Sequence, residues 1–381
     1  MRWDNLRLDD HLAAQQEAGD GGTLFPAERR EVALPLIERG AVARTFDTPG
    51  FRGMTFYEVQ AKSIVNRVPE ASRMPFRWTI NPYRGCQHAC VYCFARQSHS
   101  YLELDTGADF DTKVVVKVNA PDLVRKKMAS PAWSGEHIAM GTNVDCYQRA
   151  EGRYQLMPGI ISALRDAANP FSILTKGTLI LRDIELLAEA ADVTEVGLNV
   201  SAGFVDKDLW RSIEPGTPAP GRRLEACAAL NERGLRCGVL MGPVVPFLSD
   251  SPAQLGETVR QIAAAGAGHV APIVLHLRPG TRDWFFSWLR ARHPGLVGRY
   301  LDLYGGSAYT PKAYQARIAG QVRELADKYG IGRPRPGFGH GRRPVAVIPG
   351  PGPGRGPETP EPPAAEPHVL PRARAEQLTL L

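Results

Sequence analysis

Three cysteines lie within eight residues of the segment NPYRGCQHACVYCFAR. Cys86, Cys90 and Cys93 are spaced C-x3-C-x2-C in a chain of 381 residues that has only six cysteines, so chance is a poor explanation. A short loop can turn three thiols toward one centre, and thiolates are the ligands of iron–sulfur clusters. Three thiolates would hold three irons of a four-iron cluster. The fourth iron would stay open to a small molecule that carries an amine and a carboxylate.

Zinc is the alternative metal for the same cysteines. His88 or His99 would complete a Cys3His set. Structural zinc sites usually place a second pair of ligands about a dozen or more residues from the first pair, and no second pair follows here at that interval. The spacing therefore favours an iron–sulfur cluster. A non-catalytic iron–sulfur or zinc adaptor protein remains an alternative.

The elements that must position this loop follow a regular pattern from Phe76 onward. Short β-branched apolar runs alternate with amphipathic segments of helical length, which is typical of βα units and a parallel sheet. We predict strands within residues 76–83, 136–144, 171–176, 193–201, 236–245 and 269–277, followed by terminal helices within 281–294 and 311–330. The predicted fold is α/β, a partial (β/α)6 TIM-like barrel with the cysteine loop after its first strand.

Composition divides the chain into three parts. Residues 1–72 have Gly-rich breaks and no periodic core, and we expect an N-terminal extension packed on the main domain. Residues 73–332 form the predicted core barrel with its terminal helices, and the Pro/Gly-rich residues 333–381 form a disordered tail that ends in a short apolar peptide. The tail has seven basic and four acidic residues, so it carries +3 of the net charge of +6. Residues 1–332 together are then mildly basic, which permits a nucleic-acid partner without requiring one.

The compartment follows from what the sequence contains. The N-terminal residues include acidic side chains and no continuous apolar stretch, so they predict neither a signal peptide nor a transit peptide. No apolar run is long enough to span a membrane, and we expect no membrane partner. Clustered cysteines in a chain of this length favour a metal site in a reducing compartment, so we expect a cytoplasmic protein.

The C-x3-C-x2-C spacing, with Tyr92 before the last cysteine and a first barrel strand before the loop, resembles the radical S-adenosylmethionine (SAM) superfamily. The resemblance implies a 4Fe-4S cluster whose fourth iron chelates the amino and carboxylate groups of SAM. It implies one-electron cleavage of SAM to methionine and a 5'-deoxyadenosyl radical, which abstracts hydrogen from a substrate. It further implies an electron donor such as a flavodoxin or ferredoxin.

Under this resemblance, polar residues at the strand ends would hold SAM. After the second strand, Thr142 or Asn143 would accept a hydrogen bond from the SAM amino group, because a Gly-Gly-Glu-like motif is absent there. Lys176 ends the third strand, where its ammonium would pair with the SAM carboxylate. An ordinary helix N-cap is the alternative for Thr142 and for Asn143.

The next two strands offer further positions. Asn199 and Ser201 are two residues apart on the fourth strand, so both face one side and would bond the SAM ribose. Gly242 and Pro243 on the fifth strand resemble the family's turn beside the adenine. A simple loop is the alternative there.

Three segments, NPYRGCQHACVYCFAR, ILTKG and RSIEPGTPAPGRRLEA, resemble the branch related to spore photoproduct lyase, a DNA repair enzyme, over about residues 55–300. That lyase has a hydrogen-donor cysteine just before its second-strand Thr-Ser pair, where this chain has Met140 or Gly141. Cys146 is the nearest substitute, with Tyr147 beside it, and a small buried residue is the alternative. The resemblance predicts a lyase-like enzyme acting on a nucleic-acid base or lesion, but the missing donor cysteine means that thymine-dimer repair itself is not transferred to this chain. Modification of a protein or a small metabolite stays open.

Four charged residues of the third segment, Arg211, Glu214, Arg222 and Arg223, lie near the predicted mouth of the barrel. We expect either phosphate contacts or a solvated surface network there.

The last residues of the chain, Gln377, Leu378, Thr379, Leu380 and Leu381, resemble peptides that dock bacterial repair proteins onto the sliding clamp. The Gln amide can make directional hydrogen bonds while the leucines fill an apolar groove. A frayed end or a tail docked on its own domain is the alternative.

Overall fold

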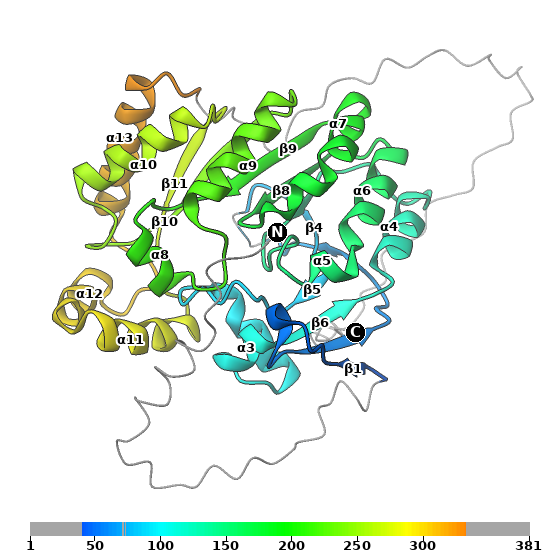
Figure 1. Cartoon of the computed structure of the whole chain (residues 1–381), viewed down its shortest axis with the longest axis horizontal. Coiled ribbons are helices and arrows are strands. Elements are labelled where there is room, and N and C mark those ends of the chain that lie inside the picture. Colours follow the sequence, from blue (N-terminus) through cyan, green and yellow to red (C-terminus); the bar gives the residue numbers. More distant parts are fainter. Residues whose placement is uncertain (1–39, 71, 73, 333–381) are drawn as a thin grey trace, which may run out of the picture.

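The computed structural model describes residues 40–70, 72 and 74–332 (Figure 1). Six parallel strands lie side by side in chain order: β4 (Trp78–Ile80), β7 (Ile138–Met140), β8 (Phe171–Thr175), β9 (Val196–Ser201), β10 (Cys237–Val244) and β11 (Val270–Val274). β3 (Val65–Arg67) pairs antiparallel with β4 at one edge, so the sheet stays open. Each of the six strands lies within a predicted range. The prediction of a partial α/β barrel is confirmed.

Helices cover the outer face of this sheet (Figure 1): α4 (Ala120–Met128), α6 (Leu156–Asp166), α7 (Ile184–Val193), α9 (Pro220–Glu232), α10 (Pro252–Ala264) and α13 (Lys312–Lys328). Alternate strand residues such as Ile173 and Val239 are buried with helix residues such as Leu187 and Ile262 in the main core. The inner face is less covered, since Leu240 is only half-buried and Ile273 is exposed. The helices therefore hold the strands from one side and leave an accessible inner wall.

A second sheet, which we did not predict, supports the start of the cysteine loop. Its order is β1 (Val42–Arg44), β2 (Thr55–Val59), β6 (Lys113–Lys117) and β5 (Tyr83–Arg84). β2 runs parallel to β6, and β5 runs antiparallel to it. Strands from the segment before residue 73 thus pair with strands that follow it, and this segment is built into the unit that carries the cysteine loop.

The remaining elements join these layers: the short helices α3 (Ala108–Thr112), α5 (Glu151–Tyr154) and α8 (Lys207–Ile213), the 3-10 helices η1 (Pro49–Phe51), η2 (Phe94–Leu102), η3 (Thr178–Asp183) and η4 (Pro294–Leu296), and the helices α11 (Thr281–Arg292) and α12 (Val297–Tyr304). Phe285 and Tyr300 from the last two helices pack with Val91 and Trp210 in a second apolar cluster. The cysteine loop is therefore packed on one side against α11 and α12.

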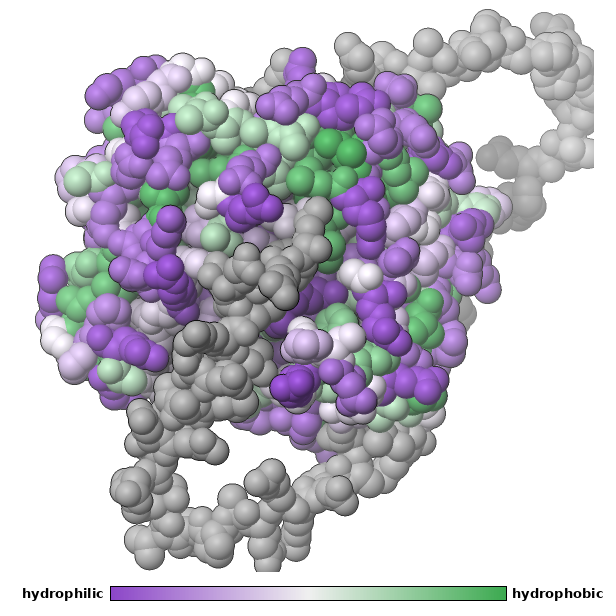
Figure 2. Space-filling model, in the orientation of Figure 1, coloured by the Kyte–Doolittle hydropathy of each residue, from purple (hydrophilic) through white to green (hydrophobic). Residues whose placement is uncertain are grey.

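Hydrophilic side chains cover most of the face seen in Figure 2, with smaller hydrophobic areas among them. Among residues 40–332, leaving out positions 71 and 73, no helix is long and apolar enough to cross a membrane. The predicted tail, with its clamp-like peptide from Gln377 to Leu381, lies outside the described residues.

Candidate functional site

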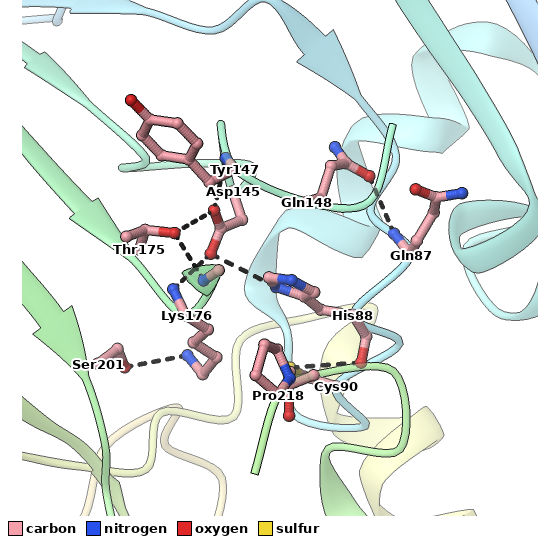
Figure 3. Close-up of polar contacts among 12 residues, drawn as sticks. Gln87, His88, Cys90, Asp145, Tyr147, Gln148, Thr175, Lys176, Ser201 and Pro218 are labelled. Carbon is pink, nitrogen blue, oxygen red and sulfur yellow. Dashed lines mark hydrogen bonds and ion pairs between the residues drawn. The ribbon is translucent and has the colours of Figure 1, made fainter. Parts of the chain in front are cut away.

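The carboxyl ends of the parallel strands bring the predicted site residues to one edge of the barrel. The cysteine loop leaves β4 through β5, Lys176 directly follows β8, and Ser201 ends β9. Figure 3 shows side chains from these strand ends pointing toward one another. Such an edge is where open and closed α/β barrels place their active sites.

Backbone contacts shape the cysteine loop. Gly85 has a φ of +85°, and a Cβ there would lie 2.7 Å from the carbonyl oxygen of Lys113, so only glycine fits. The amide of Cys86 donates to Phe110 O over 3.0 Å, and the amide of Val91 donates to Ile213 O over 3.1 Å. The loop is thereby turned at its start and fixed to two neighbouring segments.

The three thiols of this loop are free and lie close enough to act on one another electrostatically. Cys86 and Cys90 are buried, and Cys93 is half-buried. Burial raises the pKa of the Cys90 thiol to about 12, and the neighbouring Lys176 ammonium acts in the opposite direction. Burial also raises the pKa values of Cys86 and Cys93. Thiolates in such a pocket need a positive partner, which metal coordination supplies.

The donor set consists of three thiols, the ligand type of iron–sulfur clusters. No three His, Cys, Asp or Glu side chains converge on a position for one metal ion in the part of the chain that the structure describes. Both histidines proposed for zinc have other partners, since His88 Nδ1 lies 3.4 Å from Asp145 Oδ2 and His99 Nε2 lies 2.9 Å from Lys113 O. In a 4Fe-4S cluster each thiolate binds a different iron, so the sulfurs surround the cluster and do not meet at one atom.

Arg96 holds the loop from the side of the second sheet. It is buried, and its guanidinium donates to Cys90 O over 3.1 Å and to both carboxylate oxygens of Asp111 over 2.9 Å. The same guanidinium stacks 4.8 Å from the ring of Trp284 in α11. One side chain thus joins the loop to two distant elements.

Gln87 and His88 hold the loop from the barrel side. The side chain of Gln148 accepts from Gln87 N over 3.0 Å and donates to Gly85 O over 3.0 Å. Figure 3 shows the His88 ring directed at Asp145, and burial lowers the pKa of His88 to about 4, so the imidazole is uncharged at neutral pH.

Asp145 is a site residue that the sequence reasoning missed. Its carboxylate accepts from Thr175 Oγ1 over 2.6 Å, from Lys176 N over 2.6 Å and from Tyr147 N over 2.9 Å. The carboxylate therefore ties together the exits of β7 and β8 and, through His88, the cysteine loop. Its sequence signal was its position after the second strand, beside the polar residues that we did select.

Tyr92 and the RSIEPGTPAPGRR segment meet under the loop. The Tyr92 hydroxyl donates to Glu214, which forms an ion pair with Arg223, and all three side chains are buried. The expectation of phosphate contacts or a solvated network is wrong for Glu214 and Arg223, because the fold buries these opposite charges against each other.

The other two arginines of this segment lie on the surface. Arg211 pairs with Asp208 over 2.7 Å, and Arg222 pairs with Glu225 over 2.6 Å. Their charges are thus already matched by carboxylates on the same helices, α8 and α9.

The residues predicted to hold SAM lie along this edge and differ in their surroundings. Lys176 Nζ donates to Ser201 Oγ over 3.0 Å, and Ser201 Oγ donates to Gly242 O over 2.9 Å (Figure 3). These three residues therefore form one group. Asn199 is half-buried two residues before the end of β9, where its Oδ1 is 2.8 Å from Nε2 of His269, the residue before β11.

The loop after β7 carries the remaining predicted residues. Thr142 and Asn143 are half-buried at the mouth. Gly141 has a φ of +74°, and a Cβ there would lie 1.8 Å from Leu174 O, so no cysteine side chain fits at that position. Cys146 is 1% exposed in the main core, and burial raises its pKa well above the usual value. That position suits the small buried residue that was the alternative to a hydrogen donor.

A group of exposed and half-buried side chains, which we call the rim cluster, borders the loop beyond Cys93: Phe94, His276, Arg278 and Tyr309. Phe94 and Tyr309 are 43% and 42% exposed. The Arg278 guanidinium lies 5.3 Å from the Phe94 ring centre and 3.4 Å from the Tyr309 hydroxyl. Within the described residues Arg278 has no carboxylate partner. The rim cluster therefore offers two aromatic faces and one uncompensated cation.

Comparisons with known proteins agree with this arrangement. A family model described as the radical SAM superfamily matches residues 80–259. An uncharacterized protein of Mycobacterium tuberculosis is 49% identical over 307 residues, which cover 80% of this chain and 90% of the relative. An uncharacterized protein of Methanocaldococcus jannaschii is 32% identical over 203 residues, which cover 53% of this chain and 72% of the relative.

Solved structures show the same fold. Spore photoproduct lyase complexed with dinucleoside spore photoproduct superposes with a TM-score of 0.53 at 13% identity, over 73% of this chain and 80% of the lyase. A variant of that lyase with bound AdoMet and the dinucleoside superposes with a TM-score of 0.52 at 12% identity, over 69% and 77% of the two chains. At these identities the likeness concerns the fold alone.

Proposed function

Since the chain belongs to the radical SAM superfamily, we propose that it is an enzyme that cleaves SAM reductively at a 4Fe-4S cluster held by Cys86, Cys90 and Cys93. The observation that carries the proposal is the cysteine loop itself, whose three free thiols lie together at the carboxyl ends of the strands. When bound, the cluster would supply one electron for cleavage of SAM to methionine and a 5'-deoxyadenosyl radical.

The protein's own residues would bind and orient SAM beside this loop. Lys176 follows β8, and its ammonium donates to Ser201 at the end of β9 and has no carboxylate partner within the described residues, so it can pair with the SAM carboxylate. Thr142 and Asn143 lie across the mouth on the loop after β7, where an amide or hydroxyl oxygen can accept from the SAM amino group.

For the substrate we propose a nucleic-acid base or lesion. The rim cluster supports this choice because aromatic faces stack on bases and an unpaired arginine attracts phosphate. The solved lyase structures with a dinucleoside share the fold. A protein side chain or a small metabolite is the alternative. Deuterium transfer from labelled DNA, RNA or lysate fractions into 5'-deoxyadenosine would distinguish these substrate classes.

The experiment that tests SAM cleavage uses anaerobically reconstituted protein, SAM and dithionite, with 5'-deoxyadenosine as the product measured. We expect product from the natural protein and none from Cys90→Ala. The matched control is Cys227→Ala, which removes a buried thiol from α9 outside the loop and should leave product formation in place. Product formation that survives in Cys90→Ala would refute the proposed cluster ligand set.

A further inference from the structure

The segment after α8 contacts the cysteine loop through a buried ion pair. The Glu214 carboxylate accepts from the Tyr92 hydroxyl with one oxygen and from the Arg223 guanidinium with the other. Glu214 and Arg223 have side chains that are 0% and 1% exposed. Burial is the largest single influence and acts to raise the pKa of Glu214, but Arg223, Lys176 and the Tyr92 hydroxyl together outweigh it and the pKa is lowered, so the carboxylate stays ionised.

Arg223 also donates hydrogen bonds to oxygen atoms other than those of Glu214. Its guanidinium donates to Pro218 O over 2.7 Å and to Ser201 O, at the end of β9, over 3.1 Å. It also donates to Thr217 Oγ1 over 2.6 Å. A buried charge with this many fixed partners cannot rotate away from Glu214 without leaving donors unsatisfied.

The backbone of the same segment packs directly on the loop. Gly216 N donates to His88 O over 3.1 Å, and a Cβ at Gly216 would lie 2.0 Å from Gln87 O. The segment therefore contacts the loop at His88 through its backbone and at Tyr92 through Glu214.

Both charges of the pair lie directly behind the loop. The Glu214 carboxylate accepts from the hydroxyl of Tyr92, which precedes Cys93, and the Arg223 guanidinium donates to the same carboxylate. Two opposite charges are thus buried together beside the cysteines.

We propose that Glu214 and Arg223 are positioning residues that fix Tyr92 and the back of the cysteine loop, and that their opposite charges balance each other at the cluster. This inference rests on the proposed function. It assigns a role to RSIEPGTPAPGRR that depends on the buried pair and on no contact of these residues with SAM or substrate.

The inference predicts a pattern of signs in the reduction potential of the cluster, because local charge and hydrogen bonding set that potential. Glu214→Gln removes a negative charge, so the reduced cluster becomes easier to form and the potential rises. Arg223→Gln removes a positive charge, so the potential falls. Tyr92→Phe removes the proton that shields the carboxylate, so the potential falls by less.

The test is an anaerobic redox titration of each reconstituted variant, followed by the electron paramagnetic resonance signal of the reduced cluster. The matched controls are Glu225→Gln and Arg222→Gln, which remove the same charges from an exposed pair on the same helix, 61% and 66% exposed. We expect their potentials to stay at the natural value, because solvent screens exposed charges.

Some outcomes would overturn the inference. If the substitutions only loosened the loop, the reduction potentials of all three variants would shift in one direction. If the pair were too far away to act on the cluster, none of the three potentials would shift. If the two charge variants do not fold, Tyr92→Phe still tests the predicted direction of the shift in reduction potential, because it leaves no buried charge without an ion partner. A rise or an unchanged potential in Tyr92→Phe then contradicts the inference. Failure of the proposed function is distinct, since the natural protein would then hold no reducible cluster.

Discussion

The cysteine loop and the rim cluster lie side by side at the same edge of the barrel, and they are held in opposite ways. In the loop, Gln87, His88, Tyr92 and Arg96 each reach a partner in another segment, and most of these contacts are buried. In the rim cluster, the aromatic rings of Phe94 and Tyr309 are partly open to solvent. Under the proposed function, the buried contacts would fix the loop for a bound cofactor, and the open rings would leave the rim cluster available to a larger molecule.

The largest effect should come from breaking the fixed side. Arg96→Met would leave the Asp111 carboxylate buried without its partner, and we expect the free energy of unfolding of the apo-protein to fall by about 3–5 kcal/mol. Anaerobic urea denaturation measures it. The control is Arg125→Met, which breaks the exposed Arg125–Asp122 pair and should cost about 0–1 kcal/mol. Equal losses in the two variants would show that Arg96 does not anchor the loop.

An intermediate effect should come from the turn after β7. Gly141→Ala adds a methyl group where Leu174 O lies 1.8 Å from the ideal Cβ position, and it also forces alanine to a φ of +74°. Gly234→Ala forces alanine to a φ of +90° but meets no atom within 4 Å. We expect Gly234→Ala to lower the free energy of unfolding by about 1–2 kcal/mol, from backbone strain alone, and Gly141→Ala to lower it by more. Thermal or urea unfolding that ranks them in the other order would argue against the close packing of β7 on β8.

The smallest effect on stability should come from the rim cluster, where we expect single substitutions to change the free energy of unfolding by no more than about 0.5 kcal/mol. Phe94→Ala should weaken binding of a labelled single-stranded oligonucleotide about tenfold, because one stacked base is lost. Arg278→Gln should lower the dependence of binding on salt by about one phosphate contact. Fluorescence anisotropy at several salt concentrations measures both effects.

The control for the rim is Arg299→Gln, since Arg299 of α12 lies 4.0 Å from the Phe247 ring in a second cation–aromatic pair outside the rim cluster. If Arg299→Gln weakens oligonucleotide binding as much as Arg278→Gln does, the loss of any surface positive charge explains the effect. The rim cluster then has no specific role in binding.

Much of this arrangement was predictable because it is local. The six parallel strands are short, mainly apolar runs with β-branched residues, such as FSILT, and the cysteine spacing is confined to one loop. Lys176 and Ser201 were found because a strand end fixes where the next polar residue must lie.

The rest depends on partners that the local sequence does not show. β2 pairs with β6 across more than 50 residues, and neither strand is longer than five residues, so the second sheet has little local signal. Arg223 looks like its exposed neighbour Arg222 in sequence. It is buried against Glu214, nine residues earlier in the same segment, which supplies the opposite charge.

The central claim is that three thiolates hold a 4Fe-4S cluster and leave one iron for SAM. Iron analysis of the anaerobically reconstituted protein, combined with electron paramagnetic resonance of the reduced protein before and after SAM addition, tests it most directly. The account predicts about four irons per chain and a spectrum that changes when SAM binds the open iron. Colourless protein with one zinc ion, or a reduced cluster whose spectrum SAM leaves unchanged, would contradict it.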